Sequence, residues 1–304
     1  MTAAENVTLA PSFWGSVNTW ECDENDHQNV RFFAHKINQA LQAWAADRAG
    51  DPAMTARVLP SITSQHIRFL REARAAAPVR VECGQIAHAA DRLTVVSVMR
   101  HNATDEPLAA FQTVLDTRGW PASWPKPPAG EMPGGEVPEY AQPRGLDPAT
   151  LPAPPASLAA ALASGFRIVG RGVIGGEECG PEGTLLPHGY IGRVSDGMPN
   201  LWVFLNSAAD LAAREEGVMG GAALEYHLRI HEPLQRGDVY THLSGVRALA
   251  AKTQTMAHVV ISERTGRCAA SASAIGVGMD LRTRKAVAIP PERRARLEQL
   301  LLKE

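Results

Sequence analysis

Residues 22–48 read CDENDHQNVRFFAHKINQALQAWAADR, a polar cluster followed directly by a regular apolar pattern. The large apolar side chains of the second part are spaced by four, four and three residues: Phe33, Ile37, Leu41 and Trp44. This spacing predicts one buried face of an amphipathic helix over residues 30–48. The polar cluster therefore lies at the N-terminus of a long helix.

Strands are predicted around this helix from runs of aromatic and β-branched residues with period-two alternation. One precedes it at 13–22, and four follow it, at 61–70, 79–88, 93–101 and 108–116. The later part of the chain repeats the pattern: a strand at 166–174, a helix at 201–214 and strands at 223–231, 238–248, 253–262 and 268–279. A single long helix followed by consecutive antiparallel strands must cover one face of their sheet. The predicted fold class is α+β.

The two parts also share short sequence matches. His66-Ile67-Arg68-Phe69 corresponds to His227-Leu228-Arg229-Ile230, and Leu115-Asp116-Thr117-Arg118 to Met279-Asp280-Leu281-Arg282. Between the parts, residues 121–155 hold 11 of the 22 prolines, a density that blocks helices and strand ladders. We expect a duplicated domain, with copies at 1–120 and 156–304 joined by a linker at 121–155.

Composition narrows the classes of partner. The 304-residue chain has 30 Lys and Arg against 32 Asp and Glu, a formal net charge of -2, which predicts neither a nucleic-acid partner nor a membrane surface. No apolar stretch is long enough for a membrane span, and no secretory leader is recognisable, so a cytoplasmic location is expected. The four cysteines are at least 61 residues apart and form no metal-binding or disulfide pattern.

The string Asp23-x-Asn25-x-His27-x-Asn29, placed before a helix, resembles the D-x-x-G-H-V-N-N and D-x-N-x-H-V-N-N signatures of hotdog-fold thioesterases. These proteins cleave acyl-CoA or acyl-carrier-protein thioesters and form the 4-hydroxybenzoyl-CoA thioesterase-like superfamily. The two-copy layout resembles the double-hotdog members. The resemblance implies a tandem hotdog, each copy a long helix wrapped by an antiparallel sheet, packed as an internal pseudo-dimer with one working site at the boundary and open to further homo-oligomerisation.

For the chemistry, the resemblance implies a hydrolase with Asp23, His27 and Asn25 as catalytic residues. Asp23 would attack the thioester carbonyl or activate a water. The predicted helix at 30–48 contains no Glu that could act as the catalytic carboxylate instead. The N–H groups near Val30 would hold the carbonyl oxygen, Asn29 would fix the turn, and Arg68 would meet CoA phosphates. Neither a cofactor nor a metal is expected, with CoA entering only as part of the substrate.

Two alternatives stay open at this stage. Asp, Asn and Glu collect before helices because they cap them, so the cluster is also explained as a cap. In that case the protein binds acyl thioesters without cleaving them. An enoyl hydratase or dehydratase matches less well, because its Asp and His are five apart and Asp23 and His27 are four apart.

The second copy is expected to lack a complete site. Before its predicted helix it carries Ser195-Asp196-Gly197-Met198-Pro199-Asn200, without a histidine, and we interpret Pro199 and Asn200 as a helix start. His227 and His231 are four apart, as metal ligands on a helix would be, yet they follow strand alternation. We expect them to line a polar sheet face.

Overall fold

A computed structural model of the chain describes residues 7–56, 59–89, 91–118, 120 and 137–303. The chain divides into two compact units. The first comprises residues 1–144 and 179–188, and the second comprises 145–178 and 189–304. Most of the predicted linker, residues 121–136, lies outside the described residues, so the predicted domain boundaries stay a prediction.

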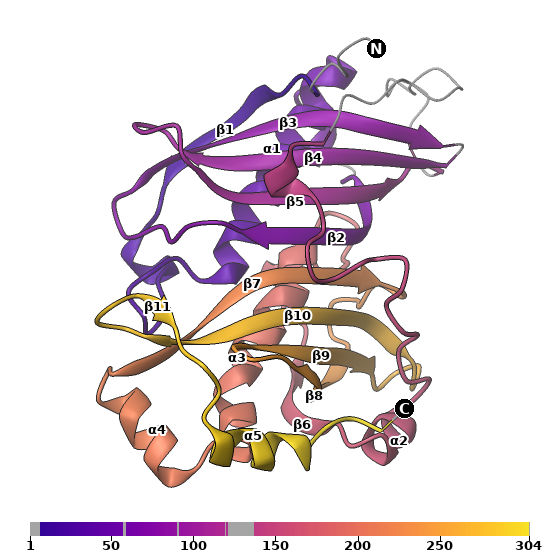
Figure 1. The fold of residues 1–304 in the computed structure, drawn as a ribbon. Helices are drawn as coiled ribbons and strands as arrows, with labels where there is room; N and C mark the ends of the chain where they lie inside the picture. Colours follow the sequence, from indigo (N-terminus) through magenta and orange to yellow (C-terminus); the bar gives the residue numbers. More distant parts are fainter. Residues whose placement is uncertain (1–6, 57–58, 90, 119, 121–136, 304) are drawn as a thin grey trace, which may run out of the picture. The chain divides into compact units, whose positions relative to one another are not determined.

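The first unit is a five-stranded antiparallel sheet with one long helix, α1 (Val30–Ala49) (Figure 1). The strand order is β1-β3-β4-β5-β2. All four predicted apolar residues of the helix are buried, which confirms the predicted face. The strands are β1 (Ala10–Ser16), β2 (Ser61–Phe69), β3 (Pro78–Ala89), β4 (Arg92–His101) and β5 (Pro107–Asp116).

The second unit repeats this order as β7-β10-β9-β8-β6, with the short β11 (Lys285–Ala286) added to β10. The antiparallel α+β class predicted from the sequence is thus observed in both units. The other strands are β6 (Arg167–Val173), β7 (Met219–Ile230), β8 (Val239–Leu249), β9 (Thr253–Ser262) and β10 (Cys268–Asp280).

Two predicted elements are wrong. The second long helix, α3, covers Pro187–Leu205 instead of 201–214, and Pro199 lies inside it rather than at its start. Glycines 189, 192 and 197 disguise this helix, because glycine has low helix propensity. A separate α4 (Ala208–Glu215) begins with a capping box at Ser207. The predicted strand 13–22 instead ends at Ser16 and gives way to a 3-10 turn, η1 (Thr19–Glu21).

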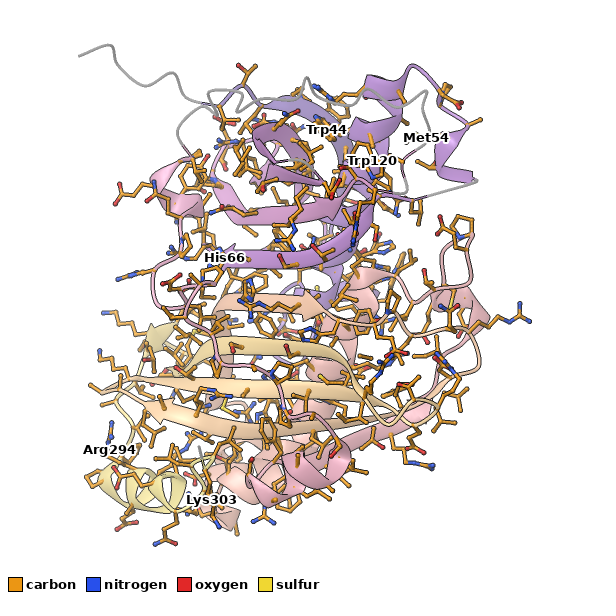
Figure 2. All side chains as sticks on the ribbon, turned by 90° about the vertical axis from the view of Figure 1, so that its right-hand side faces the viewer. Trp44, Met54, His66, Trp120, Arg294 and Lys303 are labelled. Carbon is orange, nitrogen blue, oxygen red and sulfur yellow. The ribbon has the colours of Figure 1, made fainter. Side chains whose placement is uncertain are left out.

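The shorter elements are not evident in the sequence pattern. They are η2 (Met54–Ala56), η3 (Glu139–Ala141), η4 (Gly176–Glu178), α2 (Leu158–Ala163) and α5 (Pro291–Glu298). Both arginines of the repeated His-x-Arg pattern bind carbonyl groups of the segment between η3 and α2. Arg68 on β2 donates to the Gln142 carbonyl at 2.8 Å, and Arg229 on β7 donates to the Pro148 carbonyl. Figure 2 labels the histidine of the first pattern, His66, on β2.

Candidate active site

The polar cluster forms a closed loop, residues 22–29, which we call the first loop. Cys22 and Gln28 form an isolated antiparallel bridge at its base. Inside it, the Asp23 N–H donates to the His27 carbonyl at 3.0 Å, and the Asp26 N–H donates to the Asp23 carbonyl at 3.1 Å. Asp26 has a φ of 60°, so it occupies the left-handed conformation for which the related signature uses glycine. The chain turns sharply here and presents Asp23 and His27 together.

Asp23 and His27 are the central pair of the loop. The His27 Nδ1 lies 3.3 Å from the Asp23 Oδ1, and the two side chains are only 12% and 17% exposed. On the other side of the ring, the His27 Nε2 lies 3.9 Å from the Glu72 Oε1. The imidazole is therefore flanked by two carboxylates.

The electrostatics of the loop distinguish Asp23 from an ordinary surface aspartate. Burial raises the pKa of Asp23, and this effect outweighs the opposing influence of His27 and of the Asn25 N–H, which donates to Asp23 Oδ1 at 2.9 Å. A carboxylate with a raised pKa is a better proton acceptor than a fully solvated one. The loop thus contains a group suited to general-base or nucleophilic chemistry.

The start of α1 adjoins this pair. Asn29 caps the helix, with its side chain accepting from the Arg31 N–H at 2.9 Å and its carbonyl accepting from Phe32 and Phe33. The Val30 N–H belongs to the same first turn and takes part in none of these bonds. Backbone N–H groups at such a terminus carry the positive end of the helix dipole, so they attract a developing negative charge.

Five of the six predicted site residues therefore lie on one continuous segment, from Asp23 to Val30: Asp23, Asn25, His27, Asn29 and Val30. Asn25 is buried, and its Nδ2 donates to the Glu24 side chain at 3.4 Å. Arg68 lies apart on β2, where its Nη1 is engaged by the Gln142 carbonyl. Its contact with a substrate phosphate stays a prediction.

Asp196 does not occupy the position expected for the second copy. It lies inside α3, nine residues after the helix begins at Pro187, rather than before the helix. The segment that matches the first loop is Cys179–Leu185, closed by an equivalent bridge. The interpretation of residues 195–200 as a helix start is wrong because Pro199 is accommodated within the helix.

Several residues that support the first loop were missed in the sequence. The Gln28 N–H donates to the Ala73 carbonyl at 2.7 Å, which brings the segment after β2, including Glu72, against the loop. The buried Glu21 carboxylate accepts from the Lys36 ammonium at 2.7 Å and from the Asn18 N–H at 3.0 Å. The contact of Gln28 with Ala73 and that of Lys36 with Glu21 join residues 45 and 15 positions apart, so no local sequence pattern predicts them.

Within the described ranges, no group of three or more His, Cys, Asp or Glu side chains is arranged to hold a metal ion. None of the helices there combines the length and the apolar character needed to cross a bilayer. His227 is on β7, as the predicted strand alternation requires, and it is buried.

Comparison with known proteins agrees with this fold. Residues 17–125 match the model of the thioesterase-like superfamily, a stretch that contains the whole first loop and α1. The resemblance predicted from the sequence is confirmed. No curated protein matches the chain.

Among solved structures, a putative oleoyl thioesterase from Lactobacillus plantarum superposes with a TM-score of 0.61 at 13% identity, covering 91% of this chain and 98% of its own. An acyl-ACP thioesterase from Bacteroides thetaiotaomicron gives 0.58 at 10% identity, with 88% and 97% coverage. The 12:0-ACP thioesterase from Umbellularia californica gives 0.58 at 12% identity, with 89% and 94% coverage. At these identities the likeness concerns the fold, and it extends over nearly the full length of each chain.

Proposed function

We propose that this protein is an acyl thioester hydrolase built from two tandem hotdog domains. The observation that carries the proposal is the Asp23–His27 pair, 3.3 Å apart and largely buried, at the N-terminus of α1. The thioesterase-like match of residues 17–125 and the full-length likeness to thioesterase structures support it. The substrate class is an acyl group on CoA or on an acyl carrier protein, and the compartment is the cytoplasm.

In the proposed reaction, the thioester carbonyl oxygen accepts a hydrogen bond from the Val30 N–H. The Asp23 carboxylate takes a proton from water, and the resulting hydroxide adds to the carbonyl carbon to give a tetrahedral oxyanion. Collapse of this intermediate breaks the C–S bond and releases the carboxylic acid and the thiolate, and the proton held by Asp23 passes to the thiolate sulfur, which restores the carboxylate. Direct attack by Asp23, followed by hydrolysis of the anhydride, is the other route that the same geometry supports.

The remaining residues orient these groups. His27, held between Asp23 and Glu72, positions the Asp23 carboxylate, and Asn29 fixes the first helical turn. A thiol with a pKa near that of cysteine, about 8.5, leaves without a strong general acid, so a sparse site is sufficient.

The direct test is thiol release from a panel of acyl-CoA and acyl-carrier-protein substrates of different chain length. We expect steady turnover on at least one of them, with free fatty acid detected by mass spectrometry. Saturable binding of these thioesters without turnover would instead identify a non-catalytic binding protein. Addition of water across the double bond of an enoyl-CoA, with the thioester intact, would identify a hydratase.

A further inference from the structure

The second unit encloses a chain of hydrogen-bonded side chains between α3 and its sheet. The Ser244 Oγ lies 2.7 Å from the His258 Nδ1 and 3.2 Å from the His242 Nε2. Ser244 and His258 pair directly across β8 and β9, and His242 lies two positions before Ser244 on β8. The three side chains therefore share one face of the sheet, and the serine hydroxyl bridges the two imidazoles.

This chain of side chains is sealed from solvent. His242 and Ser244 are completely buried, and His258 is only 2% exposed. The Tyr226 ring of β7 is stacked with the His258 ring, with the two planes 3° apart. Water reaches the imidazoles only if a neighbouring element moves away.

The helix α3 runs along this face of the sheet and packs on His242 (Figure 1). A Cβ added at Gly197 of α3 would lie 2.7 Å from the His242 Nδ1, so the helix backbone can come this close only at a glycine. The Asn200 Nδ2, one turn further along, donates to the Val169 carbonyl of β6 at 2.8 Å. The His242 Nδ1 itself is buried without a hydrogen-bond partner among the described residues.

This arrangement suits neutral imidazoles. A hydroxyl has a single proton, so Ser244 donates to one histidine and accepts from the other. If both histidines were protonated, each would direct an N–H group at Ser244, and its hydroxyl proton would find no acceptor on either ring. A charged His242 would also carry an N–H at Nδ1, enclosed by α3 without an acceptor, and such a buried charge is strongly disfavoured.

The surrounding charges do not favour added protons. The charged and titratable groups on the neighbouring elements are Arg193 and Asp196 of α3, Glu178 of η4, Arg167 of β6, Tyr226 of β7 and Tyr240 of β8. The Arg193 guanidinium holds the Glu178 carboxylate through two contacts of 2.7 Å. Burial, and then Arg193, lower the pKa of His242 to about 3. Burial, and then His242, lower the pKa of His258 well below 6.5.

The first unit has no histidine at the equivalent positions. Aligning the β-bulges that β3 and β8 share matches Val81 with His242, Cys83 with Ser244 and, across the strand pairing, Ser97 with His258. Cys83 and Ser97 also pair directly, with the Cys83 Sγ 3.2 Å from the Ser97 Oγ. None of these side chains takes up a proton in mild acid. The fold thus does not require two histidines at these positions.

We infer that an acid-sensitive contact holds α3 on the sheet of the second unit: the neutral chain of His242, Ser244 and His258 keeps the helix in place, and proton uptake by the two histidines releases it. In the released state both imidazoles reach water, and each binds one proton near the ordinary histidine pKa of about 6.5. The folded-state pKa values are lower, so the closed state has its full stability above about pH 6.5 and loses it as the pH falls.

The experiment is hydrogen exchange of the full chain at pH 7 and pH 5, read by mass spectrometry on peptides from α3 and corrected for the intrinsic pH dependence of amide exchange. Each histidine shifts the opening equilibrium by about 25-fold between these pH values, so the protection of α3 should fall by at least about 25-fold. His242→Val and His258→Ser, which introduce the residue types of the first unit, should each remove one histidine's share of this fall. The double variant should remove nearly all of it.

The matched control is His231→Gln, which removes an exposed histidine of the same unit and should leave the fall unchanged. Equal protection of α3 at pH 7 and pH 5 in the unaltered protein would overturn the inference. So would a fall that persists in the double variant, or one that disappears in His231→Gln. Ser244 is retained in every variant, and if one of the two single variants does not fold, the other gives the test.

Discussion

The first loop and its counterpart at residues 179–186, the second loop, have the same backbone and different side chains. The Gly180 N–H donates to the Thr184 carbonyl at 2.9 Å, as Asp23 does to His27 at 3.0 Å. Gly183, with a φ of 75°, takes the left-handed position held by Asp26. Glycine and threonine thus replace the aspartate and histidine without changing the turn.

This comparison bears on the choice between a cap and a reactive site. If Asp23 and His27 were needed to build the turn, the second loop could not form it with Gly180 and Thr184. Its helix also begins without a capping side chain, at Pro187. Asp23 and His27 are therefore dispensable for the local fold, which favours a chemical role.

The largest expected effect is a loss of thioester hydrolysis when the aspartate of the first copy, but not that of the second, is changed. Asp23→Asn keeps the shape of the side chain and removes its basicity, so thioester hydrolysis should fall by about 10²–10⁴-fold. The measurement is thiol release at saturating substrate, with folding checked by circular dichroism. Asp196→Asn, inside α3, is the control and should retain most activity. Equal losses in the two variants would mean that the second copy also works, and near-normal turnover in Asp23→Asn would remove Asp23 from the mechanism.

A second prediction concerns what the two copies share. The buried Glu21–Lys36 pair is matched by Glu178 and Arg193, joined by two contacts of 2.7 Å, and both acids also accept a backbone N–H. Glu21→Gln and Glu178→Gln each leave a buried cation uncompensated and should lower the free energy of unfolding by about 3–5 kcal/mol. Urea unfolding measures this.

The matched control for these pairs is Glu298→Gln, which breaks an exposed ion pair with Arg294. It should lower the free energy of unfolding by at most about 1 kcal/mol. If only one of the two buried variants proved destabilising, the pairs would not be equivalent in the two copies.

A third prediction uses the base of the loop. Gln28 is 2% exposed, and both polar atoms of its side chain are buried without a hydrogen-bond partner among the described residues. The second loop has the buried Leu185 at this position. Gln28→Leu should therefore stabilise the protein by about 1–3 kcal/mol.

Gln112→Leu should instead destabilise the protein, because it removes the hydrogen bond that the Gln112 Nε2 donates to the Ala141 carbonyl at 2.8 Å. Thermal and urea unfolding of both variants give the comparison. Destabilisation by Gln28→Leu would show that this amide has a polar role in the loop.

The smallest expected effect is a pH dependence of stability. Burial raises the pKa of Asp23 above its ordinary value of 3.8, so folding favours the protonated carboxyl. The corresponding stabilisation is complete below pH 3.8 and is lost as the pH rises through the folded-state pKa. The asparagine side chain of the Asp23→Asn variant does not titrate, so this variant loses no stability in that pH interval. The free energy of unfolding of the variant minus that of the unaltered protein should therefore rise as the pH increases from 3.8 to the folded-state pKa of Asp23, and stay constant above it. Unfolding of both proteins between pH 3 and 8 tests this, and a relative loss of stability with rising pH would reverse the sign assigned to Asp23.

Local sequence alone determined α1, nine of the strands to within about four residues at either end, and the polar segment before α1. Each of these rests on a pattern within a short segment, such as Phe33–Ile37–Leu41 for the helix face, while Asp23-x-Asn25-x-His27 as the site stays a prediction. The apolar period fixes which face of α1 is buried, whereas the left-handed conformation of Asp26 became evident only in the structure. The repeated His-x-Arg pattern likewise marked the two strands, β2 and β7, on which it lies.

Tertiary structure decided the rest. α3 contains three buried glycines, and Gly197 packs so closely against His242 that a side chain would not fit, so tertiary packing accounts for a residue of low helix propensity there. The partners of the first loop, Glu72 and Ala73, come from a segment more than 40 residues away, which no local pattern specifies. Propensity and spacing act along the chain, whereas burial and pairing depend on which segments meet in space.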